Sequence, residues 1–419
     1  MNIYFYIIIG ILLFEYLLSF TVRTLNLKAL EPNLPKEFED TFDNDKYLKS
    51  QEYTKTNSKF SHITSTFSFL FSLVFIFGFP QMGIDPLYNE IDQFVRLYGY
   101  GNILTGLMFF GLLTIITDLL NTPFGLYRTF VIEEKFGFNK TTLSTYFGDK
   151  VKGYFLMVLL GAPLISLTLY FFDKFDTYAW LFAWILMVLF TLIIQPIYNI
   201  FIAPMYNNFK PLEEGSLLTK IKDYLHKVDF PVKKLEVMDG SKRSGHSNAY
   251  FSGMGKNKRI ALFDTLMEQM DEDEILSVIA HEVGHYKLKH VHMGIFLSAI
   301  QSGVMLFILS LFINNTALFD VFSMQETSVY ASLVFFSILY TPVSMLMGVF
   351  FSIISRKNEF AADEYSAKTA NMPESLLTGL KKMSKKNLSN LTPHWLNVFL
   401  NYSHPPVLMR IKALKDFIK

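Results

Sequence analysis

Seven long apolar runs limit most strongly how this chain can fold. They lie near residues 2–20, 62–84, 102–121, 153–172, 178–203, 293–314 and 328–354. About 20 apolar residues are enough for a helix to cross the hydrocarbon core of a bilayer. Inside that core every backbone polar group must be satisfied within the protein, which favours helices for runs of this length. The sequence therefore predicts an all-α polytopic membrane protein with about seven transmembrane helices.

The composition agrees with a membrane protein and argues against other classes. Apolar residues make up 51% of the 419 residues and charged residues 18%, whereas a soluble domain carries about 25% charge. The formal net charge is +1, so nothing indicates the basic surface that a nucleic-acid partner requires. Because the chain has no cysteine, any bound metal must be held by histidine and carboxylate side chains.

The basic residues of the loops predict the orientation in the membrane. The loops after the first and third spans contain twelve Lys or Arg residues, and the loops after even-numbered spans contain two. The positive-inside rule then places segments 204–292 and 356–419 in the cytoplasm. Richness in Phe, Ile, Lys and Asn slightly favours a bacterial inner membrane, with the endoplasmic reticulum membrane as the eukaryotic alternative.

The polar segments divide the chain into four parts. Residues 1–203 form an N-terminal membrane region with five spans, 204–292 a first polar segment, 293–355 two further spans, and 356–419 a second polar segment. Each polar segment is too short for a core of its own, so we expect the two to meet as one unit. The first should contain a helix at 217–228, a strand at 235–238, and a small β-hairpin of 247–251 and 258–263 around a turn at 253–257.

The strongest functional signal is His281-Glu282-Val283-Gly284-His285. Asp271 as N-cap and Glu274 three residues later predict the start of the helix that carries it. Positions i and i+4 share one face of a helix, so His281 and His285 can bind one metal ion. Glu282 is rotated off that line and can serve as general base toward a metal-activated water.

A third ligand is needed, because a catalytic zinc site has three protein ligands and one open position. Segment 355–363 offers Glu359 and Asp363 four residues apart, on a helix that we expect to continue out of the last span. Glu359 would complete the site for one Zn²⁺ per chain, and Asp363 would orient a ligand histidine. A solvated acidic helix turn is the structural alternative for this pair.

Six segments together resemble the type I CAAX prenyl endopeptidase family of intramembrane zinc proteases. Besides the two metal-binding segments they are 123–139 (PFGLYRTFVIEEKFGFN), 203–215 (APMYNNFKPLEEG), 246–250 (HSNAY) and 403–410 (SHPPVLMR). The resemblance implies seven helices that enclose a chamber, with the zinc site at its cytoplasmic end. It also implies His281, His285 and Glu359 as ligands and Glu282 as general base.

The resemblance further implies a substrate-binding strand. Asn248 is similar to an asparagine that contacts the substrate backbone, with Ala249 and Tyr250 beside it. An extended peptide can pair with an exposed strand edge through backbone hydrogen bonds, and 247–251 could supply that edge. A turn residue is the structural alternative for Asn248.

Residues near the C-terminus are similar to groups that line the site near the scissile bond. These are His404 and Arg410, and either could stabilise a developing oxyanion. A structural role stays open for both, since Arg410 could simply pair with Asp363. His290 and His292 lie off the ligand face, and we interpret them as interfacial residues.

We therefore expect a membrane zinc metalloendopeptidase that hydrolyses peptide bonds near the C-terminus of proteins or peptides, prenylated ones included. Its partners would be the peptide or protein substrate and the bilayer. One alternative is a membrane quality-control zinc protease, although the five spans before residue 204 argue against its shorter relatives. The other is a catalytically inactive transporter or lipid-binding protein, against which the intact Glu282 argues.

Overall fold

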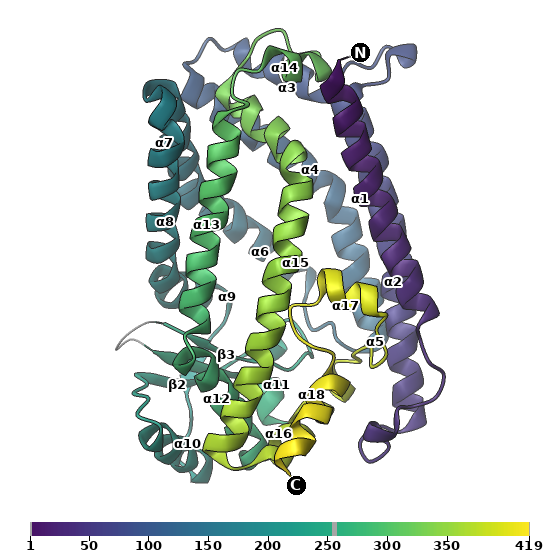
Figure 1. The fold of residues 1–419 in the computed structure, drawn as a ribbon, viewed down its shortest axis with the longest axis vertical. Helices are drawn as coiled ribbons and strands as arrows, with labels where there is room; N and C mark the ends of the chain where they lie inside the picture. The colour runs from purple at the N-terminus through teal and green to yellow at the C-terminus, as the bar shows by residue number, and fades with distance from the viewer. Residues whose placement is uncertain (1, 254–257, 419) are drawn as a thin grey trace.

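The computed structural model of the chain describes residues 2–253 and 258–418. Among these residues, seven helical stretches are long and apolar enough to cross a membrane, as the sequence predicts (Figure 1). They are α1 (Ile3–Lys28), α2 (Asn44–Phe77), α4 with α5 (Asn102–Tyr127 and Glu134–Phe136), α6 with α7 (Leu143–Leu156 and Ala162–Lys174), α8 with α9 (Ala179–Ile197 and Ala203–Tyr206), α13 (His290–Ser310) and α15 (Val329–Ala370). π-helical turns join the members of each pair, at Arg128–Glu133, Met157–Gly161 and Tyr198–Ile202.

The helices extend beyond their apolar runs. α2 begins at Asn44 rather than near residue 62, because Asp43 caps it and accepts a hydrogen bond from the Lys46 backbone. α15 continues past residue 355 to Ala370, which confirms that one helix carries segment 355–363 out of the last span. The polar ends of the spans therefore reach into the unit that holds the sheet.

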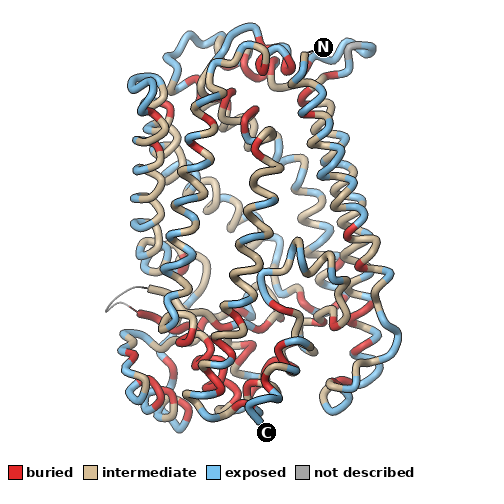
Figure 2. The backbone as a smooth tube through the Cα atoms, in the orientation of Figure 1, coloured by how far each residue is buried: buried red, intermediate tan, exposed pale blue. Residues whose placement is uncertain are grey.

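The spans bury little surface against one another. In the most apolar window of each span, only 6–17% of the residues are buried. Figure 2 shows the buried residues gathered at the two ends of the molecule, with few along the middle of the long helices. The helices enclose a chamber instead of forming a solid bundle, and the expected fold class is confirmed.

Two short helices, α3 (Leu87–Arg96) and α14 (Thr316–Val321), close one end of the chamber (Figure 1). Buried apolar side chains of both helices pack against the ends of α1, α2, α4 and α15. Tyr330 donates a 2.5 Å hydrogen bond to Asp92 within this cluster. This packing holds the helix ends together far from the sheet.

A four-stranded sheet lies at the opposite end, in the order β1-β2-β4-β3. Its strands are β1 (Phe209–Pro211), β2 (Lys234–Met238), β3 (Ala249–Ser252) and β4 (Arg259–Phe263). β3 and β4 pair antiparallel, which confirms the hairpin, and its turn at 254–257 lies outside the described residues. β2 pairs parallel with β4 and antiparallel with β1, so the hairpin belongs to a larger sheet than expected.

Helices from both polar segments pack around this sheet. Those before α13 are α10 (Ser216–Lys227), α11 (Asp264–Met267) and α12 (Glu272–Lys287), and those after α15 are α16 (Pro373–Lys386), α17 (Trp395–Asn401) and α18 (Val407–Leu414). α12 lies between α15 and α16, and its buried Ile279 and Val283 belong to the core with β4. Lys382 of α16 also pairs with the buried Glu274 of α12 at 2.6 Å. The two polar segments therefore meet in one unit.

Candidate active site

Local sequence fixes the start of α12. The Asp271 side chain accepts hydrogen bonds from the backbone N–H groups of Asp273 and Glu274, and the Glu274 carboxylate accepts one from the Asp271 backbone N–H. This is the capping box that the sequence predicts. The acidic first turn also suits the positive end of the helix dipole. α12 is thus firmly anchored at one end, and its last turns carry the two histidines.

α12 and α15 approach each other closely because small residues line their contact. A Cβ placed on Gly284 would lie 3.3 Å from the Cα of Ala362 and 3.1 Å from a ring carbon of Tyr365. One turn away, the Ser366 hydroxyl donates a buried 2.7 Å hydrogen bond to the Ser277 carbonyl. The motif helix and the helix that carries Glu359 are therefore held in a fixed register.

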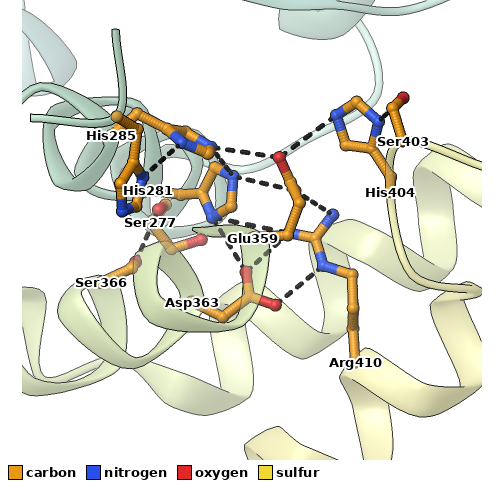
Figure 3. A network of polar contacts seen from close by, with 10 residues as sticks. Ser277, His281, His285, Glu359, Asp363, Ser366, Ser403, His404 and Arg410 are labelled. Atoms are coloured by element: carbon orange, nitrogen blue, oxygen red, sulfur yellow. Dashed lines mark hydrogen bonds and ion pairs between the residues drawn. The ribbon is translucent and has the colours of Figure 1, made fainter. Parts of the chain in front are cut away.

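This packing brings His281, His285 and Glu359 together (Figure 3). One ligand atom from each lies within 4.8 Å of the others. His285 Nε2 is 3.1 Å from His281 Nε2 and 3.2 Å from Glu359 Oε1. His281 and Glu359 are nearly buried, with side chains 9% and 5% exposed. Two imidazoles and one carboxylate converge as in three-ligand zinc sites.

The chemistry of these residues fits a cation at their centre. Glu359 Oε2 is buried and makes no hydrogen bond, and Arg410 Nη1 lies 3.3 Å from it as a compensating positive group. Burial lowers the pKa of His281, but its hydrogen bonds to Asp363 and Glu359 outweigh that effect and raise the pKa to about 9. The surrounding carboxylates therefore favour positive charge at the position that a metal ion would take.

A buried pair of charges lies behind His281. His281 Nδ1 is 2.9 Å from Asp363 Oδ1. Arg410 donates to both oxygens of Asp363, from Nε at 2.8 Å and from Nη2 at 2.6 Å. The Arg410 Nη1 also lies 3.3 Å from Glu359. The carboxylate of Asp363 thus links a histidine of the cluster to a guanidinium held by a two-point contact.

His404 reaches the cluster from the loop between α17 and α18. Its Nε2 is 3.2 Å from Glu359 Oε1, and its side chain is 64% exposed. Arg356, one turn before Glu359, donates to the backbone carbonyls of Val398 and Tyr402. Arg356 therefore fixes the end of α17 and, with it, the loop that carries His404.

A cavity of about 440 Å³ opens beside the cluster, between α13 and α15. Glu282 and His285 contribute polar groups to its wall. Burial raises the pKa of the Glu282 carboxyl, although the neighbouring histidines oppose the shift. The rest of the wall is mostly apolar and consists of Phe251, His290, Val291, Met293, Gly294, Leu297, Ser298, Phe351, Ile354, Ser355 and Asn358.

Within the described part of the chain β3 is an edge strand, because it stands at the end of the order β1-β2-β4-β3 and pairs with β4. Ala249 and Tyr250 belong to β3, and Asn248 precedes it and accepts a hydrogen bond from the Phe263 backbone. The Asn248 side-chain oxygen bonds the backbone N–H of Ala249. The last apolar residue of the strand, Phe251, lines the cavity beside Glu282. The strand edge therefore leads toward the metal cluster.

The start of β3 is held by parts of the chain that are distant in sequence. The ring of His246 stacks on Phe138, with 3.9 Å between their centroids. Its Nε2 lies 3.5 Å from Glu133. The Ser247 backbone donates to Asn387, at the end of α16. These contacts join the strand to the third span and to α16, and we did not expect them from the sequence.

The fold and this cluster define a membrane-embedded metalloendopeptidase. The family model described as CAAX prenyl protease N-terminal, five membrane helices, matches residues 23–208, and the model of peptidase family M48 matches residues 211–418. The chain belongs to the M48 peptidase family.

Known proteins similar to this chain match it over nearly its whole length. The CAAX prenyl protease 1 homolog of Arabidopsis thaliana is 35% identical, over 97% of this chain and 96% of that protein. The CAAX prenyl protease 1 of Saccharomyces cerevisiae is 35% identical, over 93% of this chain and 90% of that protein. The crystal structure of S. mikatae Ste24p has a TM-score of 0.91 at 30% identity and covers 99% of each chain. The family resemblance read from the sequence is confirmed.

Proposed function

We propose that this chain is a zinc-dependent endopeptidase that cleaves prenylated proteins near their C-terminus. The observation that carries the proposal is the convergence of His281, His285 and Glu359 beside a cavity that also contains Glu282. The names of the relatives as CAAX prenyl proteases supply the class of substrate. The closeness of one ligand atom from each of these three residues supports one Zn²⁺ per chain.

The residues around the metal would share the chemistry. When bound, zinc lowers the pKa of a water to about 7 and polarises a carbonyl. Glu282 takes a proton from the attacking water and passes it to the leaving amine. Asp363 keeps the Nδ1 proton of His281 in place, so that the Nε2 lone pair faces the metal.

His404 and Arg410 would have different roles. His404 is exposed at the cluster and can donate from Nε2 to the developing oxyanion. Arg410 is 11% exposed and already spends two donors on Asp363, so it positions that carboxylate instead of meeting the substrate. This assignment favours the structural alternative for Arg410 and the chemical one for His404.

The substrate would bind as an extra strand. Its backbone pairs with the free edge of β3 at Asn248, Ala249 and Tyr250, a mode that fixes direction without requiring a particular sequence. The largely apolar cavity beyond Phe251 accepts a hydrophobic side chain next to the scissile bond. Recognition of a prenyl group would then increase the affinity of a site that already favours extended apolar peptides.

We propose that the site faces the cytoplasm. The excess of basic residues in the loops at the sheet end supports this orientation for the metal cluster. Because plants, animals and fungi contain relatives of similar length, we favour the endoplasmic reticulum membrane over a bacterial inner membrane.

The deciding experiment compares wild type, Glu282→Gln and a matched control, Glu268→Gln, whose exposed side chain lies in the turn after α11. Zinc content and cleavage of a farnesylated CAAX peptide and its unmodified twin are measured on detergent-purified protein. We expect one zinc in all three proteins and loss of cleavage in Glu282→Gln alone. Cleavage that survives in Glu282→Gln would refute the mechanism. Equal rates on the two peptides would favour a quality-control protease.

A further inference from the structure

His290 lies outside the metal-binding motif but contacts it directly. Its Nδ1 is 3.0 Å from the Nδ1 of His285, and the two rings meet edge to face at 70° with 5.1 Å between centroids. Both side chains are partly buried and line the same cavity. Our interpretation of His290 as an interfacial residue was therefore incomplete.

A break between two helices produces this contact. α12 ends with Leu288 as its C-cap, and α13 begins at His290. Lys289, between them, adopts the left-handed conformation with φ of 62°. In an uninterrupted helix, five residues correspond to a rotation of about 140°, which would direct the two histidines to different faces. The turn at Lys289 instead returns the first residue of α13 to His285.

The position of His285 determines which atom donates in this hydrogen bond. Its Nε2 faces His281 and Glu359 and is the atom available to a metal. A neutral imidazole that offers Nε2 as a lone pair carries its proton on Nδ1. That proton therefore points at His290 Nδ1, which must accept it.

We propose that His290 is a positioning residue that holds the metal ligand His285 through this Nδ1–H···Nδ1 hydrogen bond. The inference rests on the proposed zinc site. Metal-binding histidines almost always donate their second N–H to an acceptor, and loss of that acceptor lowers metal affinity about 10–100-fold. For His281 the acceptor is Asp363 at 2.9 Å. His290 fills the corresponding role for His285 with an uncharged ring.

The test measures the zinc dissociation constant of the full-length protein in detergent by competition with a chelator. His290→Phe keeps a ring of similar size but removes the acceptor, and we expect zinc binding 10–100-fold weaker than in wild type. His290→Asn places an amide oxygen near the position of Nδ1, and we expect affinity within a few-fold of wild type. His292→Ala is the matched control, since the His292 ring contacts Tyr286.

The outcomes separate this inference from the proposed function. If wild type binds zinc and His290→Phe binds it equally well, the positioning role is refuted while the protease proposal stands. Equal weakening in His290→Phe and His290→Asn would also overturn it, because the acceptor would not be the cause. A wild type that binds no zinc would contradict the proposed function itself.

Discussion

Replacement of Asp363 by asparagine should weaken zinc binding although Asp363 is not itself a metal ligand in our proposal. The carboxylate accepts three hydrogen bonds, from His281 Nδ1 at 2.9 Å and from Arg410 at 2.8 and 2.6 Å. Asparagine offers one oxygen, and its amide N–H would face another N–H group. The variant therefore loses at least one charge-assisted hydrogen bond and the negative charge opposite Arg410.

The magnitude follows from the burial of the pair. The side chains of Asp363 and Arg410 are 3% and 11% exposed, and removal of one partner of a buried ion pair costs about 3–5 kcal/mol. Arg410 keeps Glu359 as a second partner at 3.3 Å, so we expect a loss of stability near 3 kcal/mol. The released guanidinium also competes with zinc for Glu359, and we expect zinc affinity to fall about 10–100-fold.

Chelator competition and thermal unfolding in detergent measure both effects. Glu364→Gln is the matched control, because that carboxylate forms an exposed ion pair with Lys368 at 2.6 Å and such pairs contribute only about 0–1 kcal/mol. Zinc affinity in Asp363→Asn equal to that of the control would refute the view that this carboxylate orients His281.

Three further predictions concern packing, loop position and charge. Gly284→Ala should lower zinc affinity and destabilise the protein slightly. The added methyl group overpacks the helix contact, which costs about 1–3 kcal/mol of stability, whereas the higher helix propensity of alanine stabilises the helix by about 1 kcal/mol. Zinc titration measures the affinity and thermal unfolding measures the stability. Arg356→Gln should keep zinc but reduce kcat, since it releases the end of α17 and with it the loop that carries His404; normal kinetics would contradict this. Lys381 holds the pKa of Asp40 below its usual value, so their pair stabilises the protein above the pKa of an unfolded aspartate, about 3.9, and this part is lost as the pH falls through the lowered value. Unfolding temperatures measured across that pH range should therefore depend less on pH in Asp40→Asn than in wild type.

The parts of the structure that sequence could predict depend on local patterns. The capping box of α12, the spacing of its histidines and the continuation of α15 each follow from residues within a few turns of one another. The seven spans follow from the length of the apolar runs. In all these cases helix geometry alone converts the sequence pattern into a position in space.

The parts of the structure that the sequence did not predict depend on contacts between distant segments, or on contacts that no sequence motif indicates. β1 has three residues, too few for a strand signal, and the parallel pairing of β2 with β4 joins segments that are about 20 residues apart. His290 reaches His285 because Lys289 adopts a left-handed conformation, and lysine gives no sign of such a turn. The sequence therefore indicates the metal-binding motif, but it does not indicate the strands and the histidine that hold this motif in place.

α15 links the position of the metal site to the last span. One continuous helix contains both the last span and Glu359, and it includes Pro342, a residue at which helices bend most easily. Glu359 lies about 26 Å beyond that proline along the helix axis, so a change in tilt of about 2° displaces it by about 0.9 Å. Spans adjust their tilt to the thickness of the surrounding lipid. Because α12 packs in a fixed register on the same helix through Gly284 and Ser277, such a tilt would carry the two histidines and Glu359 together and move the whole site relative to the other spans.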